Sequence, residues 1–276
     1  MKLVIQGYRG CFHEEAASEF FKDDLEIVEA RSFEVLARTL ENDLSIDYGI
    51  MAVENSIAGS ILQNYRILRE FKFRIVGELF MAIHLQLMAR KGVNMDKITE
   101  IHSHPMAIYQ SLDFLSEFPN IKIVETEDTA GSAKYISEQN AKHIGAIASR
   151  SAASIYELEI LGENIESSKT NYTRFLVIQN SRRALESDIF NKASIYFTVP
   201  HEAGSLLKCL SILDELGINM TKLQSYPLQG RLDKYYFYLD LEFENQMIYE
   251  QAVKQLNAVT EELEVLGVYR SGEYVH

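Results

Sequence analysis

The fold is indicated first by Met1-Lys2-Leu3-Val4-Ile5-Gln6-Gly7-Tyr8-Arg9-Gly10, which joins a short apolar run to a turn bounded by two glycines. Apolar runs of this length are typical of buried strands, and a helical pattern follows over residues 14–21. The run from Tyr48 to Val53 ends in the same way, in Glu54-Asn55-Ser56, before another helical stretch. Repeated strand, turn and helix indicate an α/β fold with mostly parallel strands.

The same alternation continues to about residue 180. Strands are predicted at residues 2–6, 26–30, 48–53, 73–88, 97–103, 121–125, 144–148 and 173–178. Helices are predicted at residues 14–21, 32–42, 61–71, 106–118 and 131–138. In a parallel sheet the turns from strand to helix share one edge, where ligands bind. Four such turns are present, at residues 7–10, 54–59, 103–105 and 128–131.

A second domain is predicted after a polar segment without periodicity, residues 180–188, which is interpreted as a linker. The expected order is strand 193–199, helix 204–216, strand 220–228, strand 234–243, helix 246–263 and strand 264–269, with a turn at Gln229-Gly230-Arg231. This βαββαβ order is the ferredoxin-like arrangement. The sequence therefore predicts one domain at residues 1–180 and another at residues 193–276.

The composition is that of a soluble globular protein, with 47% hydrophobic and 24% charged residues in a chain of 276. No run approaches the roughly 18 apolar residues that span a bilayer, and the first run is too short for a signal peptide. Cys11 and Cys209 lie far apart and have no metal-binding or redox spacing. We expect free thiols and a cytoplasmic location.

The net charge of −13 disfavours partners that are themselves anionic, such as nucleic acid or a membrane surface. An anionic substrate would need a local site, built from a few cations or from backbone N–H groups. Helix N-termini present such N–H groups, so the four turns could supply the site.

Each turn residue also has a purely structural explanation. Asn55, Ser103 and Thr129 are common N-cap residues, and the glycines suit a tight turn. Gln110 follows Ser103 by seven residues, which is two helical turns, so both could point to one cleft. A Thr-Arg-Phe tripeptide is ordinary in a strand. Spacing alone leaves these alternatives open.

In order and spacing, several motifs together resemble the prephenate dehydratase family. These are Gly7-Tyr8-Arg9-Gly10-Cys11-Phe12, Glu54-Asn55-Ser56-Ile57-Ala58-Gly59, Ser103-His104-Pro105 with Gln110, Asp128-Thr129-Ala130 and Asn171-Tyr172-Thr173-Arg174-Phe175. The resemblance implies a two-lobed catalytic domain like a periplasmic binding protein. One lobe would hold residues 1–78 and 165–180, and the other residues 79–164.

The resemblance also implies the reaction and the residues that perform it. Prephenate would lose CO2 and its ring hydroxyl to give phenylpyruvate in L-phenylalanine biosynthesis, without a metal or cofactor. Thr173 would assist the departing oxygen, with Arg174 and Phe175 beside it in the catalytic motif. The substrate-binding residues would be Asn55, Ser103, Gln110, Glu54, Ser56, Asn171, Thr129 and Gly10.

The C-terminal domain resembles an ACT domain, which senses an amino acid at an interface between subunits. This implies L-phenylalanine as an allosteric effector and a homodimer or homotetramer. The effector-binding residues would be Gly204, Ser205, Leu206, Gln224, Ser225 and Pro227. Gln224 and Tyr226 stand where the family has Glu and Arg, so a domain that serves only dimerisation is the alternative. Nothing resembling a fused chorismate mutase precedes the first strand, which favours the monofunctional form.

Two other functions remain open from the sequence. Arogenate dehydratase carries out the same reaction on a substrate with an ammonium in place of the keto oxygen. A non-catalytic small-molecule-binding regulatory protein could use the same two-lobed fold. A transcription regulator is disfavoured because the chain has no basic patch.

Overall fold

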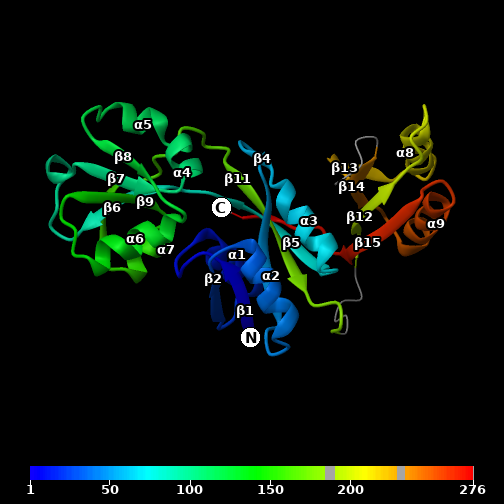
Figure 1. The fold of residues 1–276 in the computed structure, drawn as a ribbon, viewed down its shortest axis with the longest axis horizontal. Helices are drawn as coiled ribbons and strands as arrows, with labels where there is room; N and C mark the ends of the chain where they lie inside the picture. The colour runs from blue at the N-terminus through cyan, green and yellow to red at the C-terminus, as the bar shows by residue number, and fades with distance from the viewer. Residues whose placement is uncertain (184–189, 229–233, 276) are drawn as a thin grey trace. The chain divides into compact units, whose positions relative to one another are not determined.

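The computed structural model describes residues 1–183, 190–228 and 234–275 (Figure 1). The turn expected at Gln229-Gly230-Arg231 and residues 184–188 of the expected linker lie outside the described residues. By their internal contacts the residues form two units. The first unit holds Met1–Asn64, Leu79–Phe175 and Tyr274–His276, and the second holds Tyr65–Glu78 and Leu176–Glu273.

The first sheet has the strand order β16-β5-β11-β3-β1-β2, with β4 paired to β3. Its strands are β1 Lys2–Gln6, β2 Glu26–Ala30, β3 Tyr48–Asn55, β4 Gly59–Ser60, β5 Arg74–Ala82, β11 Tyr172–Gln179 and β16 Tyr274–Val275. β1 pairs in parallel with both β2 and β3, as the strand-turn-helix pattern predicts. The helices between these strands are α1 Phe12–Phe21, α2 Phe33–Asn42 and α3 Leu62–Glu70.

The second sheet has the order β10-β6-β9-β7-β8. Its strands are β6 Gln86–Arg90, β7 Glu100–Ser103, β8 Lys122–Glu125, β9 Ile144–Ala148 and β10 Leu158–Gly162. The helices are η1 Met95–Lys97, α4 Pro105–Gln110, α5 Leu112–Ser116, α6 Thr129–Glu138 and α7 Arg150–Ile155. Figure 1 shows α4 and α5 on one side of this sheet and α6 and α7 on the other. Every residue of β9 is buried, because helices cover both faces.

The apolar run at residues 73–88, predicted as one strand, is two strands that belong to different sheets. β5 ends at Ala82 and β6 begins at Gln86, so the lobe boundary expected near residue 78 falls inside β5. The polar residues His84 and Gln86 interrupt the run at the crossing, but isolated polar residues also occur within strands, so they do not by themselves mark a change of sheet. The crossing is held by Leu85, whose N–H donates to the buried Glu166 carboxylate at 2.9 Å.

Other differences concern short or terminal elements. The helix predicted at residues 106–118 is broken at Ser111 into α4 and α5, and β10 has no counterpart among the predicted strands. The strand predicted from residue 97 begins at Glu100, after the turn η1. Short helices and strands contain too few residues to show a clear period.

The second unit contains the predicted βαββαβ order. Its elements are β12 Lys192–Thr198, α8 Ser205–Glu215, β13 Asn219–Pro227, β14 Tyr235–Glu242, α9 Gln246–Asn257 and β15 Glu262–Tyr269. The strands form a sheet in the order β13-β14-β12-β15, antiparallel at each of its junctions. One face packs Ile195, Phe197 and Leu239 against Cys209 and Leu256 of the two helices.

The C-terminal residues differ from the expected domain boundary. Tyr274 and Val275 leave the second unit and form β16, which pairs in parallel with β5 in the first sheet. Just before them, Gly272 packs tightly on the backbone of Glu78, which belongs to the second unit with it. A Cβ atom on Gly272 would lie only 2.3 Å from the Glu78 carbonyl oxygen. Glycine at this position therefore allows the chain to follow β5.

The Gly272→Ala variant is expected to be less stable by about 1–3 kcal/mol, because backbone atoms cannot yield to the added methyl group. The measurement is the midpoint of urea unfolding, followed by far-UV circular dichroism. Gly145→Ala is the control, since its Cβ would meet the tip of the Leu87 side chain at 3.2 Å. Equal midpoints for Gly272→Ala and the wild-type protein would contradict the tight packing.

Candidate active site

Four predicted site residues form one buried hydrogen-bonded cluster. Asn55, at the end of β3, donates from Nδ2 to Asn171 Oδ1 at 2.8 Å and to Thr173 Oγ1 at 2.9 Å. Asn171 donates from Nδ2 to Gln110 Oε1 at 3.0 Å. β3 and β11 are neighbours in the first sheet, so residues more than a hundred positions apart meet at one edge.

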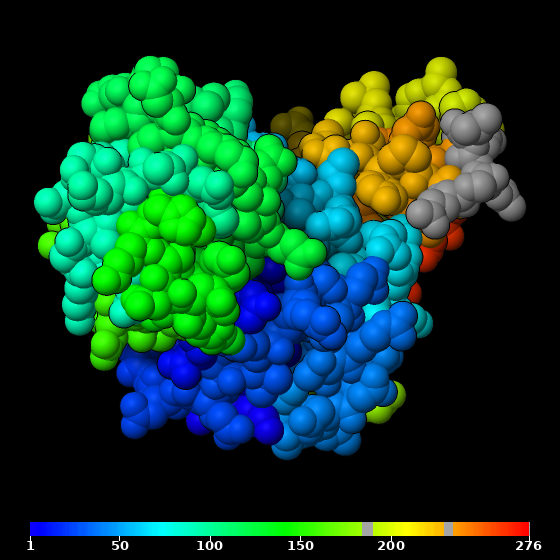
Figure 2. Space-filling model, turned by 60° about the vertical axis from the view of Figure 1, so that its left-hand side comes forward, coloured from blue at the N-terminus to red at the C-terminus, as the bar shows by residue number. Residues whose placement is uncertain are grey.

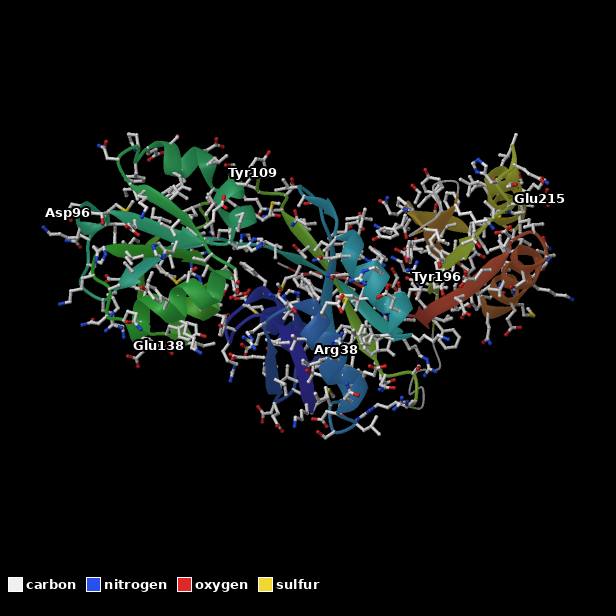
Figure 3. The ribbon with its side chains drawn as sticks, viewed as in Figure 1. Arg38, Asp96, Tyr109, Glu138, Tyr196 and Glu215 are labelled. Carbon is white, nitrogen blue, oxygen red and sulfur yellow. The ribbon has the colours of Figure 1, made fainter. Side chains whose placement is uncertain are left out.

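Gln110 reaches this cluster from α4, the helix that follows β7 of the second sheet. It is the last residue of α4 and is buried, whereas its neighbour Tyr109 is exposed on the surface (Figure 3). Gln110 Nε2 donates to Asn55 Oδ1 at 3.3 Å, which closes the ring of amides. The cluster therefore joins the two sheets at the predicted site.

The direction of every hydrogen bond in the ring follows from two backbone contacts. Asn55 Oδ1 accepts from the N–H groups of Ile57 at 3.0 Å and Ala58 at 2.9 Å. A backbone N–H can only donate, so this atom must be the amide oxygen and Nδ2 must be the donor to Thr173. Because Thr173 Oγ1 accepts this bond, its own proton remains available for donation to another group.

The neighbours of Asn55 and Thr173 lie on the opposite face of the sheet, because strand residues alternate. Arg174 is buried, and its Nη1 lies 4.0 Å from Glu54 Oε2.

The Ser56 hydroxyl donates to the Thr170 carbonyl oxygen at 2.8 Å and accepts from the Tyr172 N–H at 3.0 Å. Ser56 thus fastens the start of β11, and its hydroxyl is already engaged by backbone groups.

Phe175 lies in the core next to a neutral histidine. Its ring meets the His13 ring edge-on, with centroids 5.2 Å apart, and is 1% exposed. Burial lowers the pKa of His13 to about 4, and its Nε2 accepts from the Ala52 N–H at 3.3 Å. This arrangement supports the strand that carries Thr173 through packing.

The sequence suggests Ser103 and Thr129 as helix N-caps, but neither residue takes that position in the structure. The N-cap of α4 is His104, whose Nδ1 accepts from the Met106 N–H at 3.2 Å. Ser103 is the last residue of β7, and its hydroxyl donates to the Ile147 carbonyl oxygen at 2.6 Å. For α6 the cap is Asp128, one residue before Thr129. A motif with two adjacent capping residues cannot show which of them takes the role.

Gly10 is in close contact with α7, the helix between β9 and β10 of the second sheet. Its carbonyl oxygen accepts from the Ser149 hydroxyl at 2.5 Å, and a Cβ atom would lie 2.7 Å from Ala152 Cα. In Figure 2 the blue atoms of the first residues lie directly against green atoms of this region. Gly10 therefore lets the first turn approach α7.

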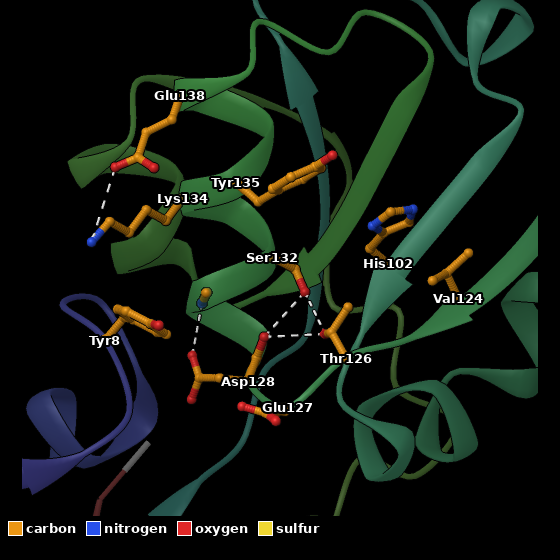
Figure 4. Close-up of a pocket in the computed structure, with 11 residues that line it drawn as sticks. Tyr8, His102, Val124, Thr126, Glu127, Asp128, Ser132, Lys134, Tyr135 and Glu138 are labelled. Carbon is orange, nitrogen blue, oxygen red and sulfur yellow. Dashed lines mark hydrogen bonds and ion pairs between the residues drawn. The ribbon is translucent and has the colours of Figure 1, made fainter. Parts of the chain in front are cut away.

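A pocket of about 520 Å³, which sequence reasoning missed, lies beside this turn (Figure 4). It is lined by Tyr8, His102, Val124, Thr126, Glu127, Asp128, Gly131, Ser132, Lys134, Tyr135 and Glu138. Lys134 Nζ lies 4.8 Å from the centroid of the Tyr8 ring. Burial raises the pKa of the Asp128 carboxyl, which also accepts from the Gly131 N–H at 2.7 Å. The signal in the sequence was Tyr8, at a position where the family has Pro.

The residues expected to bind an effector lie at two places in the second unit. Gly204 has a φ of 84° and is the N-cap of α8, which begins with Ser205 and Leu206. Gln224, Ser225 and Pro227 lie on β13, at the edge of the sheet.

Within the described part of the chain, no three His, Cys, Asp or Glu side chains are grouped as metal ligands would be. No helix in residues 1–183, 190–228 and 234–275 is long and apolar enough to cross a membrane.

Comparison with known families gives a direct match. The sequence model for prephenate dehydratase covers residues 3–183. The chain belongs to the prephenate dehydratase family. Arogenate dehydratase 2 of Petunia hybrida is 34% identical over 98% of this chain and 72% of its own length. The bifunctional chorismate mutase/prephenate dehydratase of Aquifex aeolicus is 33% identical, over 98% of this chain and 73% of its own.

One further sequence relative and two solved structures are also similar to this chain. The bifunctional enzyme of Buchnera aphidicola from Acyrthosiphon pisum is 33% identical, and 63% of its length is covered. Prephenate dehydratase of Arthrobacter aurescens, solved with L-Phe, matches 98% of this chain and 90% of its own with a TM-score of 0.86 at 24% identity. GqqA, described as a novel type of quorum quenching acylase, has a TM-score of 0.88 and 29% identity, with 98% of both chains covered. This family member is a carbon–oxygen lyase of aromatic amino acid biosynthesis.

Proposed function

We propose that this protein uses Thr173 to convert prephenate into phenylpyruvate, CO2 and water. The observation that carries the proposal is the hydrogen bond from Asn55 Nδ2 to Thr173 Oγ1, 2.9 Å long, whose direction is set by the Ile57 and Ala58 N–H groups. It orients the threonine as a donor. An oriented donor in a closed site stabilises an oxygen on which negative charge develops.

The reaction balances with one proton. The bond between the ring carbon and its carboxylate breaks, CO2 leaves, and the electron pair completes the aromatic ring. The ring C–O bond breaks at the same time, and the departing hydroxide takes up a proton to leave as water. Thr173 donates a hydrogen bond to this oxygen as the C–O bond breaks, and the proton that completes the water molecule comes from solvent. Release of CO2 and formation of the ring supply the driving force.

The other amides hold the donor in place and orient the substrate. Asn171 and Gln110 complete the ring around Asn55, so a movement of any one of the three changes the position of Thr173. Gln110 comes from the second sheet's region, so the ring is complete only when the two sheet regions are together. We assign Ser103, Ser56 and Gly10 supporting roles, because their polar groups already bind backbone or Ser149.

Acylase activity, which is named for GqqA, fits this cluster less well if threonine is the nucleophile. A threonine nucleophile needs a neighbouring base that takes its proton. The side chain bonded to Thr173 Oγ1 is the amide of Asn55, which acts as a donor there and accepts no proton. The geometry therefore favours donation by Thr173 over attack by Thr173.

For the second unit we propose an ACT-type regulatory domain that binds L-phenylalanine within a homodimer or homotetramer. Its βαββαβ fold and the edge position of β13 support this assignment. The Arthrobacter aurescens structure, which contains L-Phe, shares the fold. We assign effector binding to the turn at Gly204 and to Gln224, Ser225 and Pro227 on β13.

The proposed function is tested with the purified protein, prephenate and arogenate as separate substrates. Phenylpyruvate release from prephenate, faster than phenylalanine release from arogenate, is expected. The reverse preference would favour the arogenate reaction. Folded protein that turns over neither substrate would overturn the enzymatic proposal and leave a binding protein. A parallel series with added L-phenylalanine tests the regulatory assignment.

The Asn55→Asp variant is expected to lower kcat for prephenate by about tenfold to a hundredfold. A carboxylate has the shape of the amide but cannot donate, so the Thr173 hydroxyl would turn to donate to it. Steady-state kinetics measures the effect. Asn42→Asp, on the exposed end of α2, is the control for the added charge. Unchanged kcat in Asn55→Asp would contradict the assigned hydrogen-bond direction.

A further inference from the structure

The last residues of the chain run beside β5 toward the catalytic strand. In the second unit, a Cβ on Gly267 would lie 2.1 Å from the Ile75 carbonyl oxygen. A Cβ on Gly272 would lie 2.3 Å from the Glu78 carbonyl oxygen. In the first unit, Tyr274 and Val275 pair in parallel with Phe80 and Met81. β16 is therefore a built-in edge strand of the first sheet, one strand away from β11.

A row of side chains crosses this sheet from β16 to β3. The Tyr274 ring stacks on Phe80, with centroids 4.8 Å apart and planes 17° apart. The Arg174 guanidinium lies 5.8 Å from the centroid of the same Phe80 ring, and its Nη1 is 4.0 Å from Glu54. The Tyr274 ring also meets Tyr172 edge-on, with centroids 5.3 Å apart.

This row lies next to Asn55 and Thr173 in sequence, on the opposite face of the same strands. Tyr172 and Arg174 flank Thr173 in β11, and Glu54 precedes Asn55 in β3. Because alternate residues of a strand face opposite sides, the row and the amide ring lie on opposite faces of the same two strands. Aromatic stacking on one face therefore fixes the backbone that positions Thr173 on the other.

We propose that Tyr274 is a positioning residue for the dehydration reaction. Its ring contacts Phe80 and Tyr172 and so holds the Thr173 segment of β11 at its distance from Asn55. The proposal rests on the function proposed for Thr173. Tyr274 itself is 65% exposed and contributes to turnover only through the strands on which it packs.

The position of Tyr274 in the chain adds a regulatory consequence. Residues 270–273 connect β15, the last strand of the βαββαβ unit, directly to β16. A change in the second unit on effector binding would pull on β16 through this short covalent connection. The C-terminal strand is then the route by which L-phenylalanine acts on Thr173.

The test compares Tyr274→Ala, Tyr274→Phe and a chain that ends at Glu273. Tyr274→Ala and the truncated chain are expected to lower kcat for prephenate about threefold to tenfold, which is the loss of an aromatic pair expressed as a rate. KM should change less than twofold. Tyr274→Phe keeps both ring contacts and should retain the wild-type kcat. The control is Phe20→Ala, which removes an exposed ring from an aromatic pair with Phe21, 4.9 Å apart, outside the row.

The outcomes separate this proposal from the proposed function. If the wild-type protein turns over prephenate but kcat of Tyr274→Ala stays within twofold of it, or if Tyr274→Phe is equally impaired, positioning by the ring is wrong. If the wild-type protein has no activity, amide hydrogen exchange of residues 172–175 gives the answer. Exchange there should be faster in Tyr274→Ala than in Phe20→Ala, and equal exchange would overturn the proposal.

The regulatory consequence has its own readout. The truncated chain should still bind L-phenylalanine by calorimetry, with an affinity within twofold of the full chain, but its residual turnover should no longer be inhibited. Inhibition equal to that of the full chain would show that the signal does not pass through β16.

Discussion

Thr173→Ala is expected to lower kcat for prephenate by roughly a hundredfold to a thousandfold, with a smaller change in KM. The variant removes the hydroxyl that Asn55 orients, which is the proposed donor to the departing oxygen, together with the Thr173 methyl group. The measurement is phenylpyruvate release at saturating and at low substrate concentration. A loss in kcat/KM that follows kcat indicates an interaction made in the transition state.

The Thr173→Ser variant controls for loss of the hydroxyl as opposed to loss of packing. Serine keeps an oxygen within reach of Asn55 Nδ2, so activity should return to within about tenfold of wild type. The amide ring and the fold should be unaffected in both variants, which circular dichroism can verify. Full activity in Thr173→Ala would remove this residue from the mechanism.

Lys192→Met is expected to lower the free energy of unfolding by about 3–5 kcal/mol. Lys192 Nζ lies 2.8 Å from Glu78 Oε1, and the two side chains are 3% and 0% exposed. Removing the lysine takes away the cation that lies 2.8 Å from this buried carboxylate, while the Gly272 N–H still donates to it at 3.1 Å. The midpoint and slope of urea unfolding measure the effect in the unit that contains both residues.

The double variant Lys192→Met with Glu78→Gln should recover part of this loss, because no uncompensated charge stays buried. Lys134→Met is the matched control. Lys134 Nζ lies 4.0 Å from Glu138 on the surface of α6, where an ion pair contributes less than about 1 kcal/mol. If Lys192→Met and Lys134→Met had similar midpoints, the buried pair would not stabilise the unit.

The members of the amide ring could be named from the sequence because they lie in motifs that together resemble those of a known family. Asn55, Gln110, Asn171 and Thr173 are among the residues that the resemblance assigns to the site, and these four meet in one cluster. The spacing could not show which atom donates, because that depends on how the backbone turns at Ile57 and Ala58. The assigned roles of these residues stay predictions until they are measured.

The alternation of strands and helices predicted both an α/β fold and the βαββαβ order of the second unit. It failed where local sequence has no period. Ile83, His84 and Leu85 join two apolar strands of different sheets with a single polar residue between them, and β16 has only two residues. The sequence places Tyr274 in the C-terminal domain, because nothing near it indicates that it pairs with β5 of the first sheet.

The amide ring around Thr173 is built from uncharged groups. Its hydrogen bonds are not screened by salt as exposed ion pairs are, and none of its members changes charge between acidic and alkaline conditions. A chain with a net charge of −13 thereby places an oriented donor without first attracting counter-ions to it. The positions of the nitrogen and oxygen atoms in the ring, and not their total charge, would therefore determine how an anionic molecule is oriented there.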